Sequence, residues 1–276
     1  MKAKQFATSI LPLTRIYNKY ENKIFHKILC VLGLLLSTIT SYASEGCIEI
    51  SHVPYTIRDS GEYCLVTDLT THSRTAIFVE ADDVFLDFAG HEITTTNAPI
   101  GVMTSGVSNI VIANGILNHF NRAGVLAMGG SSILVYNMNI RDVHVGFMAN
   151  FVRAPMIINS KIINSTHAMQ FDNSDRPQIL TNEVINAELG VIVTENSKGR
   201  TLIQENTIIN TRQNVILSYS RMSILSINGN SFASFVSGNY SAIVSPHSSF
   251  CNARSNNIAG YSYMFEGCTD GGGISQ

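Results

Sequence analysis

One pattern recurs about every 22 residues through the middle of this chain, from Gly101 to Phe232, and a period of that size is typical of a solenoid. Successive copies open on a small or polar residue and start at nearly constant intervals. In a solenoid each repeat packs only against its neighbours. Because each copy also contains short alternating apolar runs, the repeat predicts a β-solenoid. The copies begin at Gly101, Gly124, Gly146, Ala168, Gly190 and Asn214.

Two apolar columns within the repeat indicate which side chains form the core. Successive side chains of a strand point to opposite faces, so residues two apart share a face. We therefore expect both columns to point inward. The first column is Val102, Val125, Phe147, Met169, Val191 and Val215, and the second is Thr104, Ala127, Ala149, Phe171, Val193 and Leu217.

An asparagine follows the second strand of each copy at nearly the same phase. Neighbouring strands lie about 4.8 Å apart, and amides stacked at that spacing can hydrogen-bond to one another. The sequence therefore predicts an asparagine ladder along one turn. Its expected members are Asn114, Asn137, Asn159, Asn182 and Asn206, followed by Asn228 or Asn230.

These features resemble the right-handed parallel β-helix repeat of the pectin-lyase-like superfamily. The resemblance covers roughly residues 76–260 and takes in the segment DSGEYCLVTDL, which begins at Asp59. It implies an all-β, single-domain right-handed parallel β-helix of roughly eight rungs, each of about 22 residues. The superfamily includes lyases, hydrolases, epimerases, adhesins and proteins with no assigned activity, so the resemblance leaves the chemistry open.

The N-terminal residues predict export. Three lysines precede an apolar run over residues 28–36, and a small-x-small cleavage site ends at Ala43. The run is shorter than the roughly 20 residues that span a bilayer, which favours a cleaved signal peptide. A retained anchor is the alternative, because the segment before the run is unusually long. We expect a secreted or periplasmic protein. The expected organisation is a signal peptide over 1–43, an N-terminal cap over 44–75, the β-helix over 76–260 and a tail over 261–276.

Four cysteines follow the predicted cleavage site, two before the repeats and two at their end. An even number in an exported chain favours disulfides. The two cysteines of each pair are separated by the same interval, and the terminal rungs of a solenoid expose sheet edges that need protection. We therefore predict the disulfides Cys47–Cys64 and Cys251–Cys268. Free thiols in a reducing compartment are the alternative.

Composition and motifs exclude several functions. The formal net charge is −2 and 14% of residues are charged. The chain therefore lacks the excess of basic residues that is typical of nucleic-acid-binding proteins. The sequence contains no GxSxG, HExxH or phosphate-loop motif. No cofactor is implied, with Ca²⁺ as the one alternative.

Charged residues gather at the turn that follows the first strand of the middle repeats. Four arginines recur there at nearly the same phase, which predicts a basic line along one edge. Stacked like charges need counter-charges, either internal carboxylates or an anionic polysaccharide that arginine binds in a bidentate manner. The expected substrate-binding residues are Arg153, Arg176, Glu195 and Arg221.

A uronic acid lyase or epimerase would use such a turn. Both reactions neutralise the carboxylate and remove the C5 proton with a base. The candidate catalytic residues are Asp172, Asp175, Lys198 and Arg200, with Arg176 or Arg200 neutralising and Lys198 as the base. The alternatives are Ca²⁺ bound by Asp172 with Asp175 or Glu195, paired carboxylates for hydrolysis, and a solvated salt-bridged turn. His144 and His167 fall at the third turn of successive rungs, where they would stack, bind a metal or be solvated.

The position between the two core columns should face outward, yet it is mostly apolar. An apolar stripe on the surface must be covered or bind something. The alternative to a polysaccharide-binding or polysaccharide-modifying protein is therefore a non-catalytic one that uses the stripe for a protein partner or self-association. The expected stripe is Met103, Leu126, Met148, Ile192 and Ile216, interrupted by Gln170.

Overall fold

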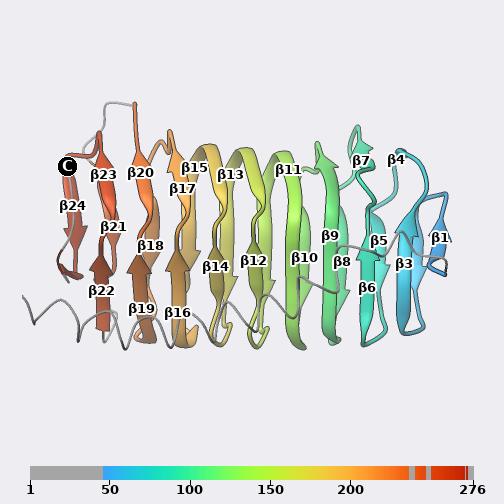
Figure 1. Cartoon of the computed structure of the whole chain (residues 1–276), viewed down its shortest axis with the longest axis horizontal. Helices are drawn as coiled ribbons and strands as arrows, with labels where there is room; N and C mark the ends of the chain where they lie inside the picture. Colours follow the sequence, from blue (N-terminus) through green and yellow to red (C-terminus); the bar gives the residue numbers. More distant parts are fainter. Residues whose placement is uncertain (1–45, 236–239, 247–249, 271, 273–276) are drawn as a thin grey trace, which may run out of the picture. The chain divides into compact units, whose positions relative to one another are not determined.

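The computed structural model of this chain describes residues 46–235, 240–246, 250–270 and 272. Residues 47–276 form one unit, and every regular element described in it is a β-strand (Figure 1). Paired strands run parallel, and successive turns lie side by side in sequence order. The predicted all-β solenoid is confirmed, with about nine turns where roughly eight were expected. The predicted signal peptide and its cleavage site lie outside the described residues.

Most turns contribute a strand to each of three faces. The first face contains β2 (Tyr55–Ile57), β5 (Thr75–Val79), β8 (Ile100–Ser105), β10 (Ala123–Met128), β18 (Ile216–Ser218), β21 (Ser241–Val244) and β24 (Tyr263–Glu266). The second contains β1 (Ile48–Ile50), β3 (Gly61–Leu65), β6 (Val84–Asp87), β12 (Met156–Ile158), β14 (Gln178–Leu180), β16 (Lys198–Gln204), β19 (Met222–Asn228), β22 (Phe250–Arg254) and β25 (Thr269–Asp270). The third contains β4 (Leu69–Thr71), β7 (Glu92–Thr95), β17 (Thr207–Ile209), β20 (Ser231–Ala233) and β23 (Asn257–Ala259). Four longer strands bend from one face to the next: β9 (Ser108–Asn118), β11 (Ser131–Asn150), β13 (Lys161–Asp172) and β15 (Glu183–Val193).

The small residue that opens most copies lies where the chain enters the first face. A Cβ atom added to it would point into the core. A Cβ atom on Gly101 would lie 2.8 Å from Cδ2 of Leu117, and one on Gly146 would lie 2.7 Å from Cδ1 of Ile162. A side chain at Gly101 or Gly146 would therefore clash with residues of the third face. The inward columns next to it stack in register, as the pairing of Val102 with Val125 shows.

The register of the sixth copy corrects the sequence-based columns. Val191 pairs with Ile216 and Val193 with Ser218, one residue later than expected. Ile216 is fully buried in the core, so it does not face outward, and Leu217 takes the outward position instead. The turn that leads into this copy is longer than those before it, and the extra length moved the predicted phase.

The predicted asparagine ladder is present, but it divides into two columns. In the early turns, exposed asparagines stack after the second face: Asn137 Nδ2 donates to Asn114 Oδ1 at 2.9 Å. In the later turns the ladder lies one residue further on and is buried. Its members are Asn182, Asn206, Asn230 and Asn256. The structure therefore selects Asn230 over Asn228.

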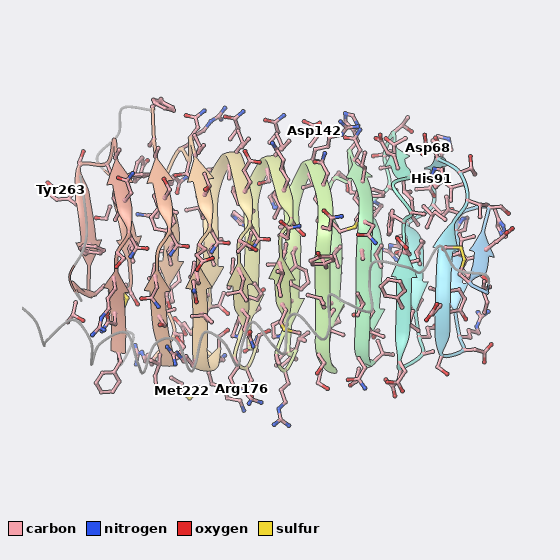
Figure 2. All side chains as sticks on the ribbon, viewed as in Figure 1. Asp68, His91, Asp142, Arg176, Met222 and Tyr263 are labelled. Carbon is pink, nitrogen blue, oxygen red and sulfur yellow. A yellow bond between two sulfur atoms is a disulfide. The ribbon has the colours of Figure 1, made fainter. Side chains whose placement is uncertain are left out.

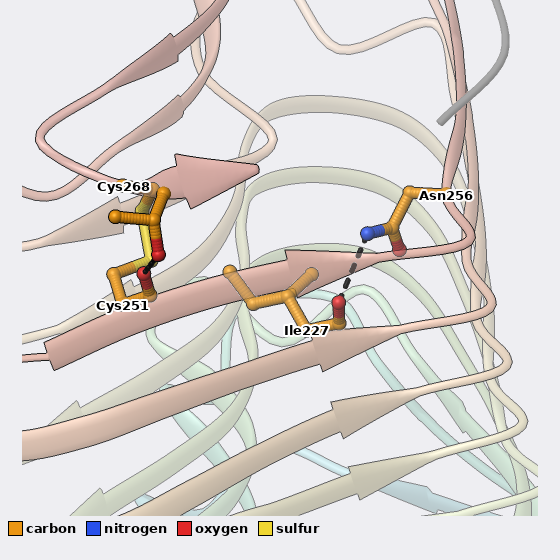
Figure 3. The surroundings of a disulfide bond; sticks show 5 residues. Ile227, Cys251, Asn256 and Cys268 are labelled. Carbon is orange, nitrogen blue, oxygen red and sulfur yellow. Dashed lines mark hydrogen bonds between the residues drawn. A yellow bond between two sulfur atoms is a disulfide. The ribbon is translucent and has the colours of Figure 1, made fainter. Parts of the chain in front are cut away.

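Each buried asparagine also satisfies backbone groups that the bend leaves without a strand partner. The Nδ2 group of Asn206 donates to the Ile179 carbonyl at 2.9 Å, and its Oδ1 accepts from the Asn182 backbone N–H at 2.9 Å. The last member repeats the pattern, because Asn256 Nδ2 donates to the Ile227 carbonyl at 2.9 Å (Figure 3). Buried polar backbone groups must be paired, so the ladder is part of the core's hydrogen bonding.

Both predicted cysteine pairs lie at disulfide distance. Cys47 and Cys64 join the first two turns with Cα atoms 5.8 Å apart, and Cys251 and Cys268 join the last turns with Cα atoms 4.6 Å apart (Figure 3). Parallel pairing also continues into the segments expected as cap and tail, since β3 pairs with β6 and β24 with β21. In the described residues, no helix has the length and apolarity needed to cross a bilayer.

The buried ladder makes a stability prediction. The change Asn206→Ala strands the Asn182 N–H and the Ile179 carbonyl in the core, and should lower the free energy of unfolding by about 2–4 kcal/mol. The matched change Asn121→Ala removes an exposed amide that donates to Asn97 Oδ1, and should cost less than about 1 kcal/mol. Guanidinium denaturation measures both, and equal losses would contradict this role for the ladder.

Candidate functional site

An open groove of about 710 Å³ extends over four successive turns, at the bend between the third and first faces. Two columns of polar side chains contribute to its lining. The inner column is Asp142, Asn164, Asn186 and Asn210, and the outer column, two residues further along each turn, is His144, Thr166, Glu188 and Arg212.

The inner column is a third ladder, exposed to solvent. Asn164 Nδ2 donates to Asp142 Oδ1 at 3.0 Å, Asn186 to Asn164 at 3.2 Å and Asn210 to Asn186 at 2.6 Å. All four residues have positive φ, between 54° and 63°, a conformation that Asn and Asp tolerate best after glycine. The same Asp and Asn residues therefore allow the tight bend and form the polar wall.

The outer column changes chemistry at each turn. It presents an imidazole, a hydroxyl, a carboxylate and a guanidinium in order along the solenoid. The carboxylate of Glu188 accepts a hydrogen bond from Gln213 Nε2, which holds it against the next turn. This wall can donate, accept and exchange protons within one groove.

A chain of hydrogen bonds crosses the outer side of β13 beside the groove. His167 Nδ1 lies 3.1 Å from Gln170 Oε1, and Gln170 Nε2 donates to Asp172 Oδ2 at 2.8 Å. The rings of His144 and His167 come from adjacent turns, with centroids 5.5 Å apart. Of the predicted catalytic residues, Asp172 is thus the one connected to the histidines.

The predicted basic line is wrong. Arg153, Asp175 and Lys198 are register partners, so a carboxylate and not an arginine follows Arg153. The other three arginines fall at different positions because this turn differs in length between copies. Arg176 lies one residue after that column, Arg200 two residues after it and Arg221 one residue before it.

The turn residues form ion pairs rather than a shared site. Asp175 lies 3.3 Å from Arg176 and 3.9 Å from Arg153, whereas Asp172 bonds to Gln170. Glu195 and Lys198 are exposed. In the described part of the chain, no three His, Cys, Asp or Glu residues come together as a metal site. Arg176 lies at the edge opposite Asp142 in Figure 2, away from the groove.

The outward apolar stripe is largely buried. Leu126 is only 2% exposed and Ile192 only 7%. The residues just before the small-residue column supply a second outward apolar row, Ile100, Ala123 and Val145, which clusters with Leu126, Met103 and Met148. Larger exposed apolar side chains lie on the second face, at Met222, Ile224 and Phe250.

A polar network on the first turns was not predicted. Asp68 Oδ1 accepts from the Glu92 backbone N–H at 3.0 Å and contacts His91 Nδ1 at 3.1 Å (Figure 2). Glu92 in turn accepts from Asn118 at 2.7 Å and pairs with Arg141 at 2.8 Å. Its members come from four turns with no common motif, so only the register reveals it.

Comparison with known families agrees with this architecture. The model of the right-handed β-helix region matches residues 59–232, which is more than half of the chain. The chain therefore belongs to the right-handed β-helix family, as its repeat predicted. No curated protein matches the sequence.

The network makes a prediction about Asp68. The Glu92 N–H first, and then His91, hold the pKa of its carboxyl below the usual 3.8. The resulting stabilisation is present above that usual pKa and is lost as the pH falls through the lowered value. His91→Ala should raise the pKa of Asp68 part of the way to 3.8, measured by NMR titration of the carboxyl carbon. His52→Ala should leave it unchanged, and an unchanged pKa in His91→Ala would refute the assignment.

Proposed function

We propose that this protein binds or modifies a polysaccharide along the groove between its third and first faces. The observation that carries the proposal is the exposed ladder from Asp142 to Asn210, in which a carboxylate and then three amides follow one another at successive turns. A polysaccharide is an extended polymer of sugar units, which present hydroxyl groups at regular intervals. A polar wall with a repeat of about 4.8 Å suits such a ligand.

The shape of the groove supports the same ligand class. Small-molecule sites are mostly apolar cavities that bury most of the ligand. This groove is open, polar and extends across four turns. An extended chain that enters and leaves at both ends fits it better than a compact metabolite.

Export is part of the proposal. Cysteine pairs at both ends of the solenoid suit an oxidising compartment, where disulfides persist. Together with the predicted signal peptide over residues 1–43, they support a role outside the cytoplasm. Polysaccharides occur there in the cell envelope and in the extracellular medium.

The outer column supports chemistry on a uronic acid. The Arg212 guanidinium would neutralise the sugar carboxylate, and Glu188 would remove the C5 proton. The turn residues Arg176, Lys198 and Arg200 remain the rival assignment for the same reaction. Because the two sets lie at different bends of the solenoid, substitutions separate them.

The first experiment incubates the protein with anionic and neutral polysaccharides in heavy water and analyses the products by mass spectrometry. Chains shortened without gain of water identify a lyase, chains shortened with gain of water identify a hydrolase, and intact chains that carry deuterium identify an epimerase. Glu188→Gln and Arg212→Ala should lower the rate by about 100-fold or more, while Lys198→Ala should not change it. The reverse pattern would place the site at the arginine turn.

Binding is measured on the same panel by calorimetry, so a non-catalytic protein is also detected. Arg212→Ala should weaken binding of an anionic chain, whereas Arg58→Ala, an exposed pair partner of Glu80 on an early turn, should not. Absence of both binding and turnover across the panel would refute the proposal.

The alternative function, an interaction protein that uses the apolar stripe, makes a different prediction. A docking residue should lose its partner on substitution while the fold stays intact. Because Ile192 is buried, Ile192→Asp should instead lower the free energy of unfolding by about 2 kcal/mol or more. Leu217, its register partner, is half-buried, so Leu217→Asp should lower the free energy of unfolding by less. Denaturation measures both changes. A fully stable Ile192→Asp variant would mean that Ile192 is accessible, as the interaction function requires.

A further inference from the structure

Between Phe78 and Val244, Gln170 is the one polar side chain in an otherwise apolar outward row. Its register partners are Met148 on one side and Ile192 on the other, and both are apolar. An aliphatic residue would pack there as its neighbours do. The glutamine instead joins His167 to Asp172 by two hydrogen bonds, of 3.1 Å and 2.8 Å.

This chain determines which nitrogen of His167 carries the proton. The carboxylate of Asp172 can only accept, so the amide nitrogen of Gln170 must face it. The amide oxygen of Gln170 then faces His167, and Nδ1 of that ring must donate. In the neutral ring, the lone pair is therefore left on Nε2.

A second imidazole lies beside this one. His144, from the preceding turn, has its ring centroid 5.5 Å from that of His167, with the planes inclined at 41°. His144 is exposed and lines the groove, whereas His167 is half-buried and held by Gln170.

We propose that His144 and His167 together bind a divalent transition metal of the zinc type at the rim of the groove. Imidazole nitrogen is a preferred ligand of such ions. A metal-bound histidine nearly always donates its other ring N–H to a fixed acceptor, which selects the tautomer and orients the ring. Gln170 supplies that acceptor, and Asp172 holds Gln170 in place. Gln170 and Asp172 are thus positioning residues.

Two protein ligands leave the other coordination positions of the metal open. Across the described ranges no third His, Cys, Asp or Glu completes a cluster. Water, or an oxygen of a molecule in the groove, fills those positions. The nearest acidic residue along the chain, Asp142, is already engaged with Asn164.

Calorimetric titration of the full chain, without a histidine tag, with Zn²⁺ tests the site. The protein should bind one equivalent, and His144→Ala and His167→Ala should each lose that binding. Gln170→Met conserves volume and suits the apolar row, so it should keep the denaturation midpoint but weaken the Zn²⁺ affinity about 10- to 100-fold. His72→Ala, an exposed histidine on an early turn bonded to Thr96, should leave the affinity unchanged.

NMR of the imidazole nitrogens gives a readout that a merely structural network would not move. His167 should carry its proton on Nδ1 without metal, and Zn²⁺ should shift its Nε2 resonance. Gln170→Met should abolish the tautomer preference.

No Zn²⁺ binding, or binding that survives both histidine substitutions, would overturn the proposal. The titration contains no carbohydrate, so its outcome is independent of the polysaccharide proposal.

Discussion

The in-register stacking of equivalent residues governs this fold. Every turn places each side chain directly against its counterparts in the turns before and after. Identical amides therefore complete each other's hydrogen bonds, as Asn182, Asn206 and Asn230 do in the interior. Aromatic rings obey the same rule: Phe147 and Phe171 from adjacent turns pack edge to face with centroids 5.8 Å apart. A residue is favourable here only if it packs well against the residues at the same position in the adjacent turns. Stacked like charges repel, which explains why so few residues are charged.

The same constraint makes the groove informative. A column held by a ladder is structural, because each member is needed by the next. A column that changes residue type at every turn gains nothing from stacking, so its side chains are free for other tasks. The two walls show this contrast side by side, with repeated amides on one and His144, Thr166, Glu188 and Arg212 on the other. The regular wall gives the spacing and the irregular wall gives the chemistry.

Sequence periodicity was sufficient for the fold, the core columns up to Val193 and both cysteine pairs. It failed where turn length varies. One extra residue moved Ile216 from the surface to the core, and unequal turns dispersed the expected arginine line. The burial of the stripe could not be predicted from its own column, because its residues cluster with a second apolar row, such as Ile100, that precedes each small residue. The inner wall of the groove is visible in the sequence, since an Asp or Asn recurs along it with the period of the repeat.

The exceptions within regular columns carry most of the remaining information. A solenoid tolerates a polar residue in an apolar row only when something compensates for the lost packing. For Gln170 the compensation is its pair of hydrogen bonds, which hold His167 in a single tautomer beside His144. A network whose only role was stability would not need a histidine at its end, because any donor would satisfy the Gln170 oxygen. The imidazole adds a second nitrogen that the network leaves as an acceptor, and that nitrogen is the reason to expect a ligand at this point of the solenoid.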